Sequence, residues 1–438
     1  MTPALPRVRA DRLGNGLHLR AVDMHALPIV SLALMFRAGS NDDPAGHAGL
    51  SHLTGVSLDA GTTTSDIHAL AERIEFLGTT FHVTTMHDAS FIVCSTLTHH
   101  VNDVMNIVGE ILCGAAFPQQ EVDRLRVTQA TSLIQMRDRP GVRASHALDR
   151  LLFGPEHPYG IPTMGMRNTV EVLTNLDTTA FFRERYRPAG AVAIATGDVT
   201  IDGWHETCER HLGRWQGATA ASRSRPQAKS QDSRRIFLID RPATPQAEVR
   251  MGSVAMPRNH PDYLAATVLN HCLGGQFSSR LNTSLREQRG LTYGAWSAFS
   301  ALRSSGTFVQ GGAFHTARTD EAISVMIDEV RRIAREGVTQ EELQYAQRSL
   351  SGTFLRSFET PSQMAGRLQA MYAYDLRDDH YRTYLTRLNA LTGHEIRRVA
   401  QHWLNPDRFA VVVVGDSSSL KKPLETLGLG EIVVYDDA

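Results

Sequence analysis

The stretch GHAGLSHLTGVSLDAGT, Gly46 to Thr62, contains two histidines among small residues and ends in Gly-Thr. The imidazole of histidine is a common zinc ligand, and two histidines serve one metal when they project from the same helix face, one turn apart. His47 and His52 stand five residues apart, well off a common face. The adjacent His99 and His100 are expected to point apart at the surface. The stretch therefore resembles a zinc site, but His47 is poorly placed to serve as a second ligand beside His52.

The elements that must position these residues come in two similar sets. RPAGAVAIATGD (187–198) and NPDRFAVVVVGD (405–416) each contain a proline, a short gap, an apolar strand and a Gly-Asp turn. A second pair, FPQQEVDRLR (117–126) and VTQEELQYAQ (338–347), predicts a capped helix start at nearly the same offset. Two matches in register favour an internal duplication.

The duplication predicts two homologous domains, over residues 1–217 and 236–438, joined by a linker over 218–235. The linker sequence ATAASRSRPQAKSQDSRR is rich in Ser, Ala, Gln and Arg and lacks apolar periodicity, as solvated linkers do. Each half then has a plausible size for a single domain.

Within a half, strands and helices are mixed. IVSLALMFRAGS (29–40) alternates as a strand does, and SDIHALAERIEFLG (65–78) predicts a helix with Ser65 as its N-cap. TTFHVTTMHDASFIVCSTL (79–97) predicts a hairpin around His87-Asp88. Strands paired through hairpins, with helices between them, indicate the α+β class: in each domain a mainly antiparallel β-sheet flanked by helices.

Charge and hydropathy limit the partners and the location. Lys and Arg number 45 against 46 Asp and Glu, a net charge of -1, which argues against nucleic acid or an anionic membrane as the main partner. The sequence has no apolar stretch near the ~20 residues of a membrane helix. The first residues, MTPALPRVRADRLGNG, carry charges where a signal peptide has an apolar region. We expect a cytoplasmic location.

Several motifs together resemble a known family. Gly61-Thr62, HPYGIPTMG (157–165), FFRERYRPAGAVAIATGD (181–198) and LREQRGLTYGAWS (285–297) occur in the order found in the M16 zinc peptidases. That family includes pitrilysin, insulin-degrading enzyme and the mitochondrial processing peptidase. The resemblance covers nearly the whole chain and implies a two-domain half-clamshell.

Active M16 members carry H-x-x-E-H on a helix: the histidines bind zinc, the glutamate takes a proton from zinc-bound water, and a glutamate on a later helix completes the coordination. Aligned on Gly61-Thr62, this motif falls on HLTGV, residues 52–56. His52 remains, but Gly55 stands at the base position and Val56 at the second ligand position. On the later helix, Leu125 stands where the acidic ligand belongs. The resemblance implies that this chain binds no metal itself.

The resemblance also assigns a role to Arg286 and Tyr293, seven residues apart in LREQRGLTYG. They match the arginine–tyrosine pair of the C-terminal half of M16 enzymes, which closes over the zinc site and contacts the substrate carbonyl. Both side chains donate hydrogen bonds, which suit an oxygen that gains negative charge. Outside this motif, the two residues would be read as a surface arginine and a packed tyrosine.

A lost zinc motif beside an intact Arg/Tyr pair implies the noncatalytic subunit of a heterodimeric M16 zinc peptidase. The expected partner is a homologous chain with an intact H-x-x-E-H motif that carries the zinc, or a second copy of this chain in its absence. The expected substrate is a peptide. Two alternatives remain: a purely structural paralogue that serves as a scaffold, and a self-sufficient metallopeptidase with unorthodox ligands.

Overall fold

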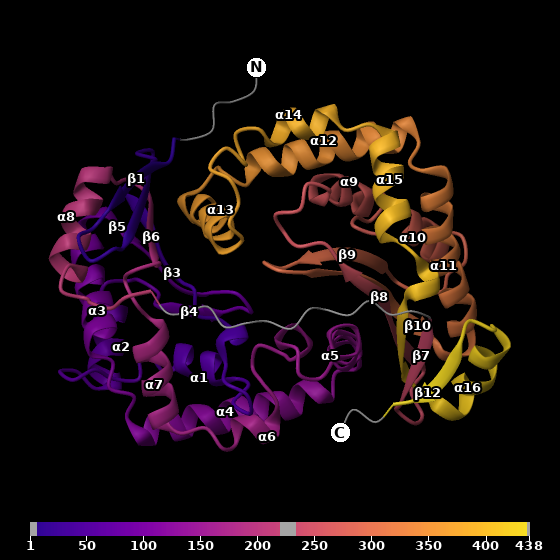
Figure 1. Cartoon of the computed structure of the whole chain (residues 1–438), viewed down its shortest axis with the longest axis horizontal. Coiled ribbons are helices and arrows are strands. Elements are labelled where there is room, and N and C mark those ends of the chain that lie inside the picture. Colours follow the sequence, from indigo (N-terminus) through magenta and orange to yellow (C-terminus); the bar gives the residue numbers. More distant parts are fainter. Residues whose placement is uncertain (1–6, 220–233, 436–438) are drawn as a thin grey trace. The chain divides into compact units, whose positions relative to one another are not determined.

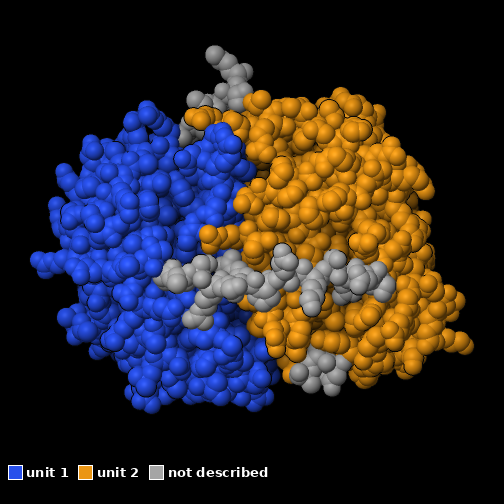
Figure 2. All heavy atoms as spheres, in the orientation of Figure 1, with its two compact units in different colours: residues 1–134, 162–225, 354–380 blue, residues 135–161, 226–353, 381–438 orange. Residues whose placement is uncertain are grey.

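The computed structural model describes residues 7–219 and 234–435 (Figure 1). The chain groups into two compact units: unit 1 comprises residues 1–134, 162–225 and 354–380, and unit 2 comprises residues 135–161, 226–353 and 381–438 (Figure 2). Of the linker predicted over 218–235, residues 220–233 lie outside the described part of the chain.

Unit 1 contains a six-stranded sheet. In spatial order its strands are β1 (Arg9–Arg12), β2 (His18–Asp23), β6 (Val192–Gly197), β3 (Ile29–Phe36), β5 (Ser90–Leu97) and β4 (His82–Thr85). β2 and β6 run parallel, and the other neighbouring pairs run antiparallel. The predicted strand from Ile29 and the predicted hairpin around His87-Asp88 are thereby confirmed as β3 and the β4–β5 pair.

Unit 2 contains a second six-stranded sheet, whose order matches that of unit 1 except at one edge, where the last strand of the chain lies parallel to its neighbour. Its strands are β12 (Glu431–Val434), β7 (Arg235–Asp240), β11 (Ala410–Gly415), β8 (Gln246–Ala255), β10 (Gly306–His315) and β9 (Ala295–Ala301). β7 runs parallel to β11 as β2 does to β6, while β11, β8, β10 and β9 pair antiparallel in turn. The two strands recognised as a repeat, β6 and β11, therefore hold equivalent central places, and the mainly antiparallel α+β class is confirmed.

Helices flank both sheets. In unit 1 they are α1 (Leu50–Val56), α2 (Ile67–Phe76), α3 (Val101–Gly114), α6 (Arg167–Val170), α7 (Asn175–Arg185), α8 (Ile201–Leu212) and α13 (Pro361–Ala373), and α4 (Gln119–Arg137) begins there. In unit 2 they are α5 (Pro140–Phe153), α9 (Tyr263–Leu273), α10 (Arg280–Asn282), α11 (Thr319–Glu336), α14 (Tyr384–Ala390), α15 (Gly393–Trp403) and α16 (Ser417–Thr426), and α12 (Gln340–Arg356) begins there. The second repeat is thus the start of α4 and of α12.

One helix N-terminus differs from the sequence prediction. The N-cap of α2 is Asp66 rather than Ser65, because the Asp66 carboxylate accepts a hydrogen bond from Ala69 N at 2.8 Å. Ser65 is engaged elsewhere: its carbonyl accepts from Thr62 N at 2.7 Å, and its hydroxyl accepts from Arg73 at 3.3 Å. Both residue types favour the N-cap, so the sequence did not discriminate between neighbours.

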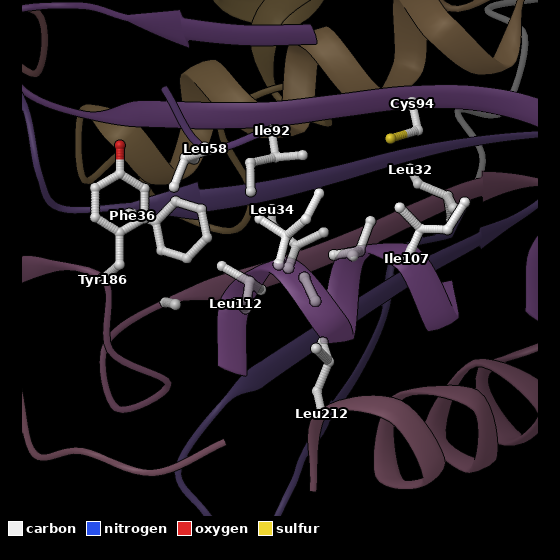
Figure 3. Packing of buried hydrophobic residues seen from close by; sticks show 14 of the residues in the cluster. Leu32, Leu34, Phe36, Leu58, Ile92, Cys94, Ile107, Leu112, Tyr186 and Leu212 are labelled. Atoms are coloured by element: carbon white, nitrogen blue, oxygen red, sulfur yellow. The ribbon is translucent and has the colours of Figure 1, made fainter. Parts of the chain in front are cut away.

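The apolar core of unit 1 lies between its sheet and helices α3 and α8 (Figure 3). Leu32 and Leu34 of β3 and Ile92 of β5 pack there in the same buried cluster as Ile107 of α3 and Leu212 of α8. At the end of β3, the rings of Phe36 and Tyr186 lie 4.7 Å apart.

The opposite face of each central sheet is covered by a helix from the other half of the chain. α13, from the second half, packs on β3 and β6 of unit 1, where Thr196 Oγ1 donates to Pro361 O at 2.7 Å. α5, from the first half, packs on β8 and β11 of unit 2, and its Leu148 and Leu152 join a buried cluster with Val412. Figure 1 shows each helix in the colour of its own half. The sequence analysis did not predict this exchange.

We expect Leu368→Ala, in α13, to destabilise unit 1 although residue 368 lies in the second half of the sequence. Leu368 is fully buried, and truncating such a leucine costs about 2–5 kcal/mol. Native-state hydrogen exchange should show reduced protection of β3 and β6 amides, with β8 and β11 as an internal reference.

Leu176→Ala is the matched control, because Leu176 of α7 belongs to the same unit and is 74% exposed. Equal losses of protection in both sheets, or none in β3 and β6, would contradict the assignment of α13 to unit 1.

Candidate functional site

Helix α1 carries three positions of the degenerate zinc motif, which we define as His52, Gly55, Val56 and Leu125. The helix begins after Gly49, whose positive φ of 98° suits glycine. The Asp43 carboxylate accepts hydrogen bonds from Gly49 N and Ser51 N, both at 2.7 Å. Burial raises the pKa of Asp43 to about 7 even though these bonds oppose the shift. The N-terminus of α1 is therefore fixed by a side chain preceding it.

The turn after α1 is fixed by Glu110 of α3. Thr62 Oγ1 donates to Glu110 Oε1 at 2.6 Å, and Arg73 Nη1 donates to Glu110 Oε2 at 2.7 Å. Burial alone would raise the pKa of Glu110, but hydrogen bonds from Thr62, Arg73, Ser65 and Thr64 outweigh it and hold the pKa at about 2. The Gly-Thr pair that anchors the motif alignment thus has a structural role.

His52 is half-buried on α1 beside Gln129 of α4. Burial lowers the pKa of the imidazole, and a hydrogen bond with the Gln129 side chain offsets part of that effect. Gln129 Nε2 also donates to Gly49 O at 3.1 Å and to Met164 O at 2.8 Å. Sequence reasoning singled out Leu125, one helical turn earlier, and missed Gln129; four-residue spacing on one helix face is the signal that links them.

The base position is filled by neighbouring side chains. A Cβ at Gly55 would lie 2.8 Å from Thr85 Oγ1 and 3.2 Å from Val83 Cγ1, both on β4. A glutamate therefore does not fit there unless the side chains of Thr85 and Val83 move. Val56 and Leu125 are half-buried and pack against the apolar core of unit 1.

These positions do not fit zinc. His52 offers one imidazole, and the other positions of the motif have no metal-binding atoms. Across residues 7–219 and 234–435, the structure contains no group of three or more His, Cys, Asp or Glu placed to hold a metal ion. His47 lies with its Nδ1 3.2 Å from Ala45 O. His99 and His100, expected to point apart, instead have ring centroids only 4.0 Å apart, in a 3-10 turn (Thr98–His100).

Arg286 and Tyr293 belong to a short segment before β9, which we call the Arg/Tyr segment (residues 285–294). Arg286 lies in a π-helical turn (Thr283–Glu287), a geometry frequent at functional sites. Leu291 N donates to Leu285 O at 2.8 Å, and both leucines are buried. Tyr293 follows two residues later with its side chain 94% exposed.

A buried glutamate of α11, Glu329, fixes the residue that precedes the Arg/Tyr segment. Ser284 Oγ donates to Glu329 Oε1 of α11 at 2.5 Å, and Arg332 donates to Glu329 Oε2 at 2.6 Å. Arg289 Nη1 donates to Ser284 O at 2.8 Å. The segment is therefore a fixed part of unit 2, and the exposure of Tyr293 is a property of its folded conformation.

Two family models match the chain. Residues 22–152 match the model described as insulinase (peptidase family M16), and residues 173–350 match the model described as peptidase M16 inactive domain. The matched segments together span more than half of the chain. The chain belongs to the M16 peptidase family.

The M16 relatives match along most of their length. An uncharacterized zinc protease of Mycobacterium bovis is 26% identical over 416 residues, which are 94% of each chain. Another, of Streptomyces coelicolor, is 24% identical and covers 90% of this chain and 86% of its own. The solved peptidase M16 inactive domain from Pseudomonas fluorescens has a TM-score of 0.88 at 24% identity, covering 94% of this chain and 98% of that one. A protease from Helicobacter pylori has a TM-score of 0.85 at 18% identity, covering 94% and 100%.

The M16 fold is thereby shown over 94% of the chain. Among the described residues, none of the helices combines the length and apolarity that crossing a membrane requires.

We expect Gly55→Glu to destabilise the protein by about 2 kcal/mol, because overpacking forces the side chains of Thr85 and Val83 out of their present positions. Gly352→Glu is the matched control, because Gly352 lies in α12 with open space around its Cβ position. Glutamate has a higher helix propensity than glycine, so this variant should be stabilised by up to about 1 kcal/mol. Urea unfolding of the two variants measures the difference. Wild-type stability of Gly55→Glu would mean that the base position is open rather than filled.

Proposed function

We propose that this chain is the noncatalytic subunit of a two-chain M16 zinc peptidase. In this proposal a homologous subunit with an intact H-x-x-E-H motif holds the zinc, and this chain supplies Arg286 and Tyr293 to the peptide substrate. A second copy of this chain could replace the homologue in its absence. We place the complex in the cytoplasm.

One observation carries the proposal: within the same chain the zinc position is filled and the Arg/Tyr segment is kept open. Gly55 is closed off by Thr85 and Val83, whereas Tyr293 is 94% exposed on a segment fixed by buried hydrogen bonds. An exposed phenol ring gives the unit little packing energy, although its segment is fixed. A substrate contact would give this ordered, exposed ring a role.

The proposed chemistry uses only hydrogen-bond donation from this chain. When water bound to the partner's zinc attacks a peptide carbonyl, negative charge develops on the carbonyl oxygen. The Tyr293 hydroxyl and the Arg286 guanidinium each donate to that oxygen. Donors fixed before the reaction stabilise the transition state more than the substrate, because the ground-state carbonyl carries little charge.

The filled zinc position also favours a second candidate, a scaffold subunit in which neither site has a role. That candidate predicts that Arg286 and Tyr293 can be replaced without consequence. A self-sufficient metallopeptidase is the least supported alternative, because the described residues lack a cluster of metal-binding side chains.

We expect the purified chain to carry far less than one zinc ion and to hydrolyse no peptide. Mixed with a zinc-bearing M16 homologue, it should elute as one complex of about doubled mass, with an interface of at least ~1,600 Å². Elemental analysis measures the zinc content, and size-exclusion chromatography measures the mass of the complex. Separate elution would argue against the partnership, and one tightly held zinc per chain would favour the self-sufficient peptidase.

We expect Tyr293→Phe to lower the kcat of the reconstituted complex about 10²–10³-fold, as the loss of one oxyanion donor does. The variant removes only an exposed hydroxyl, so folding and association should not change. Tyr345→Phe, on α12 of the same unit and 47% exposed, is the control for loss of a hydroxyl.

Arg286→Ala should act in the same direction, and the double variant should be less than additive if both side chains contact one oxygen. Full activity of a stable Tyr293→Phe complex would leave the scaffold candidate standing.

A further inference from the structure

The guanidinium of Arg286 lies over an aromatic ring. Its Cζ atom is 3.5 Å from the ring centroid of Phe277. The Arg286 side chain is only 18% exposed, whereas Phe277 is 74% exposed. The ring therefore covers the arginine while remaining largely in solvent itself, an arrangement that contributes little to the core of unit 2.

Phe277 and Tyr293 have the two most exposed large apolar side chains among the described residues of unit 2. They lie in two loops joined by Asn282, a residue only 6% exposed. Its Nδ2 donates to Gln276 O at 3.1 Å and to Ser279 Oγ at 3.2 Å, and its Oδ1 accepts from Ala295 N at 3.0 Å. The turn that carries Phe277 is thus fastened to the start of β9, two residues after Tyr293.

Stacking on a ring restricts the orientation of a guanidinium group but not its hydrogen bonding. The contact occupies one face of the planar group and leaves the N–H donors, which lie in the plane, available. Glu287 Oε1 accepts one of them from Arg286 Nη2 at 2.8 Å. A long arginine side chain otherwise loses rotamer entropy when a substrate fixes it. A guanidinium already held in one plane loses less.

We propose that Phe277 is a positioning residue: its ring fixes the plane in which Arg286 presents its free N–H groups to the peptide carbonyl. This inference rests on the proposed function, since it requires Arg286 to contact substrate. In this proposal Phe277 acts on the arginine and not on the reacting atoms, so its loss acts through Arg286.

The contact can be tested on the purified chain alone. Phenylglyoxal modifies accessible guanidinium groups, and peptide mapping reports the rate at each arginine. Phe277→Ala should raise the modification rate of Arg286 roughly two- to five-fold, as expected for losing a cation–π contact near the surface. Phe277→Tyr should leave the rate at its wild-type value.

Arg335 is the matched reference in the same samples, because it also pairs with the following glutamate but is 72% exposed. Its rate should not change. An unchanged rate at Arg286 in Phe277→Ala would overturn the proposal, since the ring would not be restraining the guanidinium. Because Phe277 is 74% exposed, the variants are expected to fold.

The role is tested in the complex reconstituted with the zinc-bearing homologue and a fluorogenic peptide. Phe277→Ala should lower kcat about tenfold with little change in KM, and Phe277→Tyr should restore kcat. In an Arg286→Ala background, Phe277→Ala should have no further effect. An undiminished effect in that background, or a change in KM alone, would overturn the inference while leaving the proposed function intact. Loss of the proposed function would instead appear as full activity of Arg286→Ala itself.

Discussion

The central strands of both sheets are buried on both faces, and most of the fold follows from that constraint. Every residue of β6 and of β11 is buried. A strand of this kind needs an apolar layer on each side, as near-continuous runs such as AVVVVG indicate. One layer comes from helices of the same half, and α13 or α5 supplies the other. Unit 1 and unit 2 are therefore not contiguous in sequence.

Close packing also surrounds the predicted degenerate zinc motif. α1 contacts β4 closely enough that Gly55 leaves no room for a Cβ without movement of Thr85. Protein interiors are packed to crystal-like density, and neighbouring atoms take up the space beside Gly55. A glutamate introduced at position 55 would lack a second histidine ligand at position 56. It would also clash with the side chains of Thr85 and Val83. The site is closed by packing as well as by composition.

Much of the fold could be predicted from sequence because the information was local. The β6 and β11 repeats, the starts of α4 and α12, and the β4–β5 hairpin each depend on a short pattern and a turn. The helix exchange could not be predicted, because an amphipathic helix shows which face is buried but not which sheet covers it. Gln129 and Phe277 were missed for a related reason: their contacts, to His52 and Arg286, are set by tertiary packing. The roles of Arg286 and Tyr293 came from a motif resemblance and remain predictions.

The two candidate sites differ in the solvent exposure of their side chains. At the predicted degenerate zinc motif, Gly55, Val56 and Leu125 carry no polar side-chain atoms, and Val56 and Leu125 pack against the apolar core of unit 1. In the Arg/Tyr segment and in the turn that carries Phe277, the opposite holds: the rings of Tyr293 and Phe277 are 94% and 74% exposed. Single exposed apolar residues are common, but these two lie on loops that Asn282 and Glu329 hold in place with buried hydrogen bonds. Ordering a loop costs conformational entropy. Here the ordered loops carry two rings, those of Tyr293 and Phe277, that are largely exposed to solvent. A segment that is both ordered and open is what a preorganised contact requires.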